Sequence, residues 1–154
     1  MFKKIGHGLF MLVTMVTVLA SVPVYAASAS WSIDMSFYFL DGQANGQFHN
    51  LADTSRGITV SGTLKSAERL PGSTPSPREI SVNISDDDGA FGDDFIGNFK
   101  VKPAANEGAS MTFSEEFPSA SSVDDEDNIG EYYMVWNKGL HDYWRITGSG
   151  TVTN

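Results

Sequence analysis

The chain has 154 residues, no cysteine and a formal net charge of −9. Its acidic balance excludes nucleic acid as a partner, because phosphate binding needs clustered lysine and arginine, and it argues against simple electrostatic attraction to anionic lipid. Without cysteine there is no disulfide framework, so stability must come from a hydrophobic core, which a bound ion could supplement.

Residues 1–26 are typical of a secretory signal peptide. They begin with the positive pair Lys3-Lys4, continue with an apolar run over residues 9–20, and end in small residues before Ala26. The run is shorter than the roughly 20 residues that a membrane-spanning helix needs. We therefore expect cleavage after Ala26 or Ala29. The expected product is a secreted, extracellular protein, and the lack of cysteine favours a Gram-positive bacterium as its source.

Residues 27–154 form the predicted mature chain. It keeps eight basic against 19 acidic residues, a net charge of −11. This length suits a single domain with one core. We expect a monomer with no transmembrane segment.

Seven segments of the mature chain alternate apolar and polar residues with a period of two, which is the pattern of half-buried strands. In chain order they are residues 31–39, 58–64, 80–85, 95–101, 111–117, 132–136 and 144–152. Clusters of Gly, Pro, Asn, Asp and Ser separate them. Regular short strands with such punctuation predict an all-β fold, an antiparallel β-sandwich of about seven to eight strands.

The alternation also predicts which side chains are buried. In the first segment, Phe37 and Phe39 continue the apolar face that begins at Trp31. In the fourth segment, Phe95 shares a face with Phe99. We therefore expect all of these rings in the core.

Acidic residues concentrate in alternate loops of the predicted sandwich. When successive strands run antiparallel, the loops over residues 41–56, 86–94 and 118–129 fall at the same end. The other end receives a set of basic residues: Lys65, Arg69, Arg78, Lys102 and Lys138. A divalent cation would offset the repulsion among the clustered carboxylates.

Residues 80–101 read ISVNISDDDGAFGDDFIGNFKV. A strand leads into Asp86-x-Asp88, five residues intervene, and Asp94-Phe95-Ile96-Gly97 opens the next strand. This segment resembles the second calcium loop of C2 domains. The resemblance implies a C2-like sandwich in which Asp86, Asp88 and Asp94 bind calcium and Phe95 or Ile96 packs beneath the loop. The strand pattern alone fits an immunoglobulin-like sandwich as well.

Calcium suits these loops because it takes six to eight oxygen ligands and tolerates irregular geometry. The two most acidic loops hold no His or Cys, which disfavours zinc and copper. Asp41 and Asp93 are the nearest candidates for further ligands. The alternative is a solvated turn, since Asp and Gly are preferred turn residues.

The leading functional hypothesis is a secreted, non-enzymatic binding or accessory domain. Calcium at the acidic end would order a surface for a lipid, a glycan or another surface partner. We predict no catalytic residue and no organic cofactor.

Two other functions stay open. One is a secreted hydrolase of polysaccharide or cell-wall polymer that uses Glu115, Glu116 and Glu131 as its carboxylates. The other is a metal-independent interaction protein, toxin or inhibitor. A group of aromatic residues is either a binding platform or part of the core: Tyr132, Tyr133, Trp136, Tyr143 and Trp144.

Overall fold

A computed structural model of the chain describes residues 27–52, 57–88, 92–120 and 129–154. The predicted signal peptide lies outside these ranges. The described residues form nine strands: β1 (Ser28–Met35), β2 (Phe39–Asp41), β3 (His49–Ala52), β4 (Ile58–Arg69), β5 (Ile80–Asp86), β6 (Asp94–Val101), β7 (Ser110–Phe117), β8 (Ile129–Asn137) and β9 (Trp144–Thr153).

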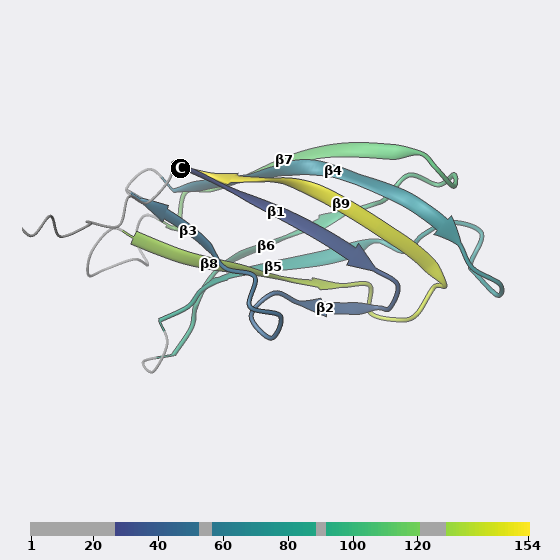
Figure 1. The fold of residues 1–154 in the computed structure, drawn as a ribbon, viewed down its shortest axis with the longest axis horizontal. Helices are drawn as coiled ribbons and strands as arrows, with labels where there is room; N and C mark the ends of the chain where they lie inside the picture. The colour runs from purple at the N-terminus through teal and green to yellow at the C-terminus, as the bar shows by residue number, and fades with distance from the viewer. Residues whose placement is uncertain (1–26, 53–56, 89–91, 121–128) are drawn as a thin grey trace, which may run out of the picture.

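The strands make two sheets that face each other (Figure 1). The four-stranded sheet has the order β1-β9-β4-β7, and the five-stranded sheet has the order β2-β8-β5-β6 with β3 also paired to β8. Every pairing is antiparallel. The predicted antiparallel β-sandwich is therefore confirmed. No helix of the described residues is long and apolar enough to cross a membrane.

The core lies between the sheets and follows the predicted alternation. On β5, Ile80, Val82 and Ile84 are fully buried while the residues between them face outward. Trp31 and Trp136 come from different sheets, and their ring centroids are 5.2 Å apart. Burying a large apolar side chain contributes about 1.5–3 kcal/mol, so this aromatic contact is a main link between the layers.

The prediction that Phe37 and Phe39 are buried is wrong. Their side chains are 68% and 46% exposed. β1 ends at Met35, and the chain then crosses to the other sheet, where Phe39 pairs with Asn137 of β8. The crossing resets the alternation, which a sequence pattern that continues across residue 36 does not reveal.

The prediction that Phe95 is buried is also wrong, because the pairing of β5 with β6 shifts between Ile84 and Ser85. Such a bulge sets two residues of one strand against one residue of its partner. Ile96 becomes the buried residue, and Phe95 is 58% exposed. Of the two residues proposed to pack beneath the loop, the structure selects Ile96.

The predicted loop over residues 41–56 contains a strand. β2 and β3 both pair with β8, and the chain between them leaves this sheet edge and returns to it. The departure begins at Gly42, whose N–H donates to the Met134 carbonyl at 3.0 Å. A side chain there would meet that carbonyl oxygen at 2.7 Å, so the close approach requires glycine.

Candidate functional site

Charge is segregated along the long axis of the sandwich, as the loop order predicts. Nine described acidic residues, and no described basic residue, lie in what we call the acidic half: Asp41, Asp86, Asp87, Asp88, Asp93, Asp94, Glu115, Glu116 and Glu131. All seven described basic residues lie in the basic half: Lys65, Arg69, Arg78, Lys100, Lys102, Lys138 and Arg145. Five acidic residues accompany them, which leaves that half with a net charge of +2: Asp34, Glu68, Glu79, Glu107 and Asp142.

The three carboxylates of the C2-like segment occupy different environments. Asp86 is buried, and its Oδ1 accepts the main-chain N–H of Glu131 at 2.7 Å. Asp94 is the cross-strand partner of Asp86 and is exposed, as is Asp88. One oxygen of Asp86 is thus committed to holding β8, while Asp88 and Asp94 lie at the surface.

Asp93 ties the first two predicted acidic loops together. Its Oδ2 accepts the hydroxyl of Tyr133 at 2.8 Å and the Nε2–H of Gln43 at 3.1 Å. Asp41 caps the neighbouring turn through the N–H of Ala44. Burial, the hydrogen bond to Asp93 and the charges of Asp93 and Asp41 raise the pKa of Tyr133, against a smaller opposite effect of Ser85.

The calcium site stays a prediction. Within residues 27–52, 57–88, 92–120 and 129–154, no group of three or more His, Asp or Glu side chains is arranged to hold a metal ion. The tip of the β5–β6 hairpin, residues 89–91, lies outside those ranges, as do Asp53 and the acidic residues 124–127.

The outer surface of the five-stranded sheet carries an arrangement that the sequence did not predict. Asn83 on β5 is the cross-strand partner of Asn98 on β6, and Ser81 is the partner of Asn137 on β8. All three asparagine side chains are exposed. Cross-strand partners lie about 4.5–5.5 Å apart, and diagonal neighbours such as Asn83 and Asn137 about 7–8 Å apart, so the three amides form one group.

Two exposed phenylalanines stand at opposite corners of this group. Phe39 on β2 is in register with Asn137, and Phe95 on β6 is in register with Ser85. The two residues are three strand spacings apart across the sheet, about 14 Å, and four residues apart along the strands, about 13 Å. We call this surface the amide face: Ser81, Asn83, Asn98 and Asn137 with Phe39 and Phe95 at its corners.

The amide face is open to a ligand. In the described part of the chain the Asn83 and Asn98 side chains make no hydrogen bond, and the Oδ1 of Asn137 accepts only the N–H of Gly139, at 2.6 Å. Charge is confined to its margins, where Lys100 pairs with Glu79 at 3.3 Å. The centre therefore offers uncharged donors and acceptors.

Asn83 and Asn98 lie within β5 and β6, where asparagine is disfavoured, so these two residues need an explanation. Asn137 is the last residue of β8, and its Oδ1 accepts the N–H of Gly139 as in a turn. Exposed threonine or lysine would suit these positions better for stability. Two exposed phenylalanines add the cost of apolar surface left in water. Residues that break local rules at one surface point to a binding role there.

The structure divides the predicted aromatic group. Three of its rings belong to the core between the sheets, those of Tyr132, Trp136 and Trp144, and Tyr133 is buried outside that core. Only Tyr143 is exposed. Tyr133 faces outward but is covered by Phe48, whose ring meets it edge-on at 6.3 Å.

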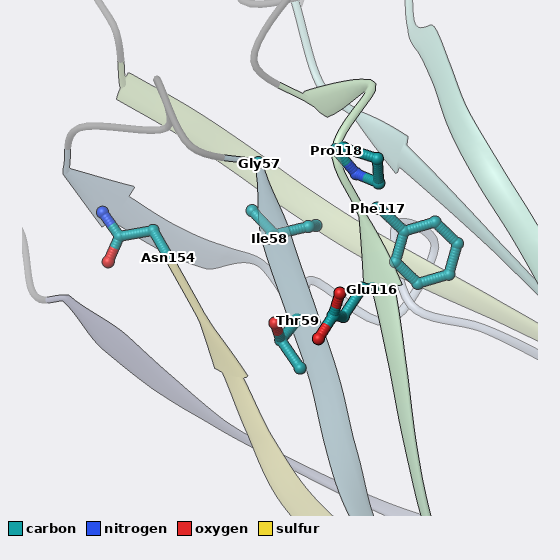
Figure 2. Close-up of a pocket in the computed structure, with 7 residues that line it drawn as sticks. All are labelled: Gly57, Ile58, Thr59, Glu116, Phe117, Pro118 and Asn154. Atoms are coloured by element: carbon teal, nitrogen blue, oxygen red, sulfur yellow. The ribbon is translucent and has the colours of Figure 1, made fainter.

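The glutamates of the hydrolase alternative do not converge. Glu115 and Glu116 are consecutive on β7 and so point to opposite faces of that strand, while Glu131 lies on β8 of the other sheet. Figure 2 shows a shallow hollow of about 140 Å³ beside Glu116, lined also by Gly57, Ile58, Thr59, Phe117, Pro118 and Asn154. One carboxylate lines it, whereas glycoside hydrolysis ordinarily uses two.

Comparison with known protein families, with curated proteins and with solved structures finds no match to this chain. The geometry of the chain itself therefore carries the functional argument. The C2-like ancestry stays a prediction.

Proposed function

We propose that this chain is a secreted, non-enzymatic binding domain that holds a neutral glycan on its amide face. The observation that carries the proposal is the group of three exposed asparagines on three adjacent strands, with a phenylalanine at each of two opposite corners.

The chemistry of the face suits sugars. Each hydroxyl of a sugar both donates and accepts, and an amide side chain offers an acceptor oxygen and two donor hydrogens. The apolar faces of sugar rings pack on flat aromatic rings. With Phe39 and Phe95 far apart, the face is long enough for several sugar units of one chain.

The charge distribution favours a neutral ligand. The amide face has no charged residue at its centre, and Lys100 at its margin is already paired with Glu79. Lys100 lies beside Ser81 but is already paired with Glu79, and Asp41 at the β2 margin is negative, so an anionic polymer would gain little counter-charge at the amides.

Calcium remains part of the proposal as an allied prediction. Asp94 directly precedes Phe95, and Asp93 holds the hairpin against Tyr133. An ion bound by Asp86, Asp88 and Asp94 would order the hairpin that presents Phe95. Calcium would then strengthen glycan binding.

The proposal is tested by native gel electrophoresis through gels containing soluble starch, mannan or β-glucan. We expect at least one neutral polysaccharide to retard the protein. Replacing Phe95 by alanine should abolish the retardation. Phe37→Ala is the matched control, because Phe37 is equally exposed but lies outside the amide face. Migration that no neutral polysaccharide changes would overturn the proposal.

A further inference from the structure

Exposed apolar side chains gather at the basic end of the sandwich, next to the Phe39–Asn137 edge of the amide face. Phe37 follows β1, and Leu140, His141 and Tyr143 lie in the β8–β9 connection (Figure 1). The ring of His141 lies 5.7 Å from that of Phe37 and 4.3 Å from that of Tyr143. Leu140 is 62% exposed. We call these four residues the apolar tip.

Buried polar contacts fix the base of the apolar tip. Lys138 and Asp142 flank Leu140 and His141 in sequence, are fully buried and pair at 2.9 Å. Lys138 Nζ also donates to the Trp144 carbonyl at 2.6 Å. Because buried contacts fix its base, the tip can present its exposed side chains for insertion into an apolar environment.

Tyr143 adds a second sign of a constrained surface. It is the one non-glycine residue of the described ranges with a positive φ, at 58°. Its N–H donates to His141 Nδ1 at 3.0 Å, which fixes the ring beside it. Strained residues that hold an exposed side chain in place occur at binding surfaces.

Three basic residues belong to segments at the same end of the sandwich as the tip, and two of these residues adjoin or make main-chain contacts with the tip segment. Arg69 precedes Leu70, whose N–H donates to the Tyr143 carbonyl, and the main-chain N–H of Arg78 donates to Asp142. Lys102 reaches the Pro77 carbonyl at 2.6 Å. These three cations are exposed and have no acidic partner among the described residues.

We propose that the apolar tip docks on the surface of an anionic phospholipid bilayer. Exposed phenylalanine, leucine and tyrosine would enter the boundary between head groups and acyl chains, and Arg69, Arg78 and Lys102 would face the anionic head groups. Each such cation strengthens binding about fivefold. This surface adjoins the Phe39–Asn137 edge of the amide face but shares no residue with it, and docking does not depend on glycan binding.

The net negative charge of the chain does not prevent this docking, because nine of the 14 described acidic residues lie in the acidic half and the basic half has a net charge of +2. β9 has 10 residues and so spans about 33 Å. The Debye length at physiological salt is about 8 Å. The far end of the acidic half therefore lies roughly four Debye lengths from the basic end, and its repulsion from the bilayer is screened.

Sedimentation with vesicles tests the proposal on residues 27–154, with a chelator present throughout. We expect binding to equimolar phosphatidylglycerol and phosphatidylcholine, little binding to phosphatidylcholine alone, and weakening at high salt. Leu140→Asp should lower the bound fraction at least tenfold. Arg69→Ala with Arg78→Ala should lower it about tenfold or more.

Two control variants distinguish the tip from other surfaces. Phe95→Ser removes an equally exposed ring from the amide face, and Lys100→Gln removes a cation that is already paired. Both should bind vesicles as the parent does, and unchanged melting temperatures show that all variants are folded. No sedimentation with anionic vesicles, or undiminished binding by folded Leu140→Asp, would overturn the proposal.

Discussion

The side chains of Lys138 and Asp142 meet at 2.9 Å in the interior, where both are fully buried. Asp142 also accepts the main-chain N–H groups of Arg78 at 2.8 Å and Trp144 at 3.1 Å. Burial alone would raise the pKa of Asp142, but these three hydrogen bonds outweigh it and the pKa lies below its usual value. The carboxylate of Asp142 thus joins the β4–β5 connection, through Arg78, to the β8–β9 connection at the basic end.

Removing the negative partner should destabilise the protein strongly. In Asp142→Asn the ammonium of Lys138 stays buried without its counter-charge, and we expect a loss of about 3–5 kcal/mol in the free energy of unfolding. Urea denaturation measures it. Lys100→Gln breaks an exposed pair with Glu79 and should cost at most about 1 kcal/mol. Equal losses in the two variants would contradict this assignment.

Lowering the pH below 6.5 should reduce the free energy of unfolding because of His49. Burial lowers its pKa below 6.5, against a smaller opposite effect of a main-chain hydrogen bond with Ser30. The unfolded chain therefore takes up a proton more readily, and stability that is constant above pH 6.5 falls as the pH drops below it. Melting curves measured as the pH falls below 6.5 should show a smaller decrease in melting temperature for His49→Gln than for the parent. A loss as steep as that of the parent would assign the effect to other groups.

At position 143 we expect glycine to be more stabilising than valine, which is the reverse of the ordinary preference in a folded chain. At its φ of 58°, a β-branched residue is strongly strained and glycine is not. We expect Tyr143→Val to be less stable than Tyr143→Gly by about 1–2 kcal/mol. At the neighbouring exposed Leu140, whose φ is not positive, valine should be the more stable of the two. The same order at both positions would argue against strain at Tyr143.

Calcium should raise the melting temperature if the acidic hairpin binds it. A site of the extracellular kind has a dissociation constant of roughly 0.1–1 mM, and binding to the folded state alone stabilises it. Asp88→Asn and Asp94→Asn should each remove most of the shift between calcium and chelator. Glu116→Gln, at an exposed acid on β7, should retain it. No shift in the parent at millimolar calcium would dismiss the site.

Local alternation was enough to predict most of the fold. The inward faces of β5, β8 and β9 follow the alternation closely enough that Ile84, Met134 and Ile146 could be placed in the core from sequence. The alternation failed where the chain changes sheet after Met35 and where the bulge shifts the pairing at Ser85. Both events depend on which strands are neighbours, and local pattern does not contain that information.

The candidate sites were less predictable for the same reason. The contact between Asp93 and Gln43 could be anticipated, because the order of the strands places their two loops at the same end of the sandwich. The alignment of Asn83, Asn98 and Asn137 depends on the register of β5 against two partners. A single asparagine within a strand, such as Asn83, is a weak signal of a binding site until the residues on the neighbouring strands are known. The apolar tip likewise needs Phe37 and His141, which are 104 positions apart, to be brought into contact.

The most direct test of the glycan-binding claim is the affinity of one double variant. Once a neutral polysaccharide that retards the parent is identified, titration calorimetry with a soluble oligosaccharide of it gives the dissociation constant. Asn83→Ala removes an amide whose lost hydrogen bonds are worth about 1–2 kcal/mol, and Phe95→Ala removes a ring contact of similar worth. We expect the double variant to bind at least about thirtyfold more weakly, while Phe37→Ala binds as the parent does. A double variant that is folded and keeps the parent's affinity would contradict the assignment of the amide face as the glycan site.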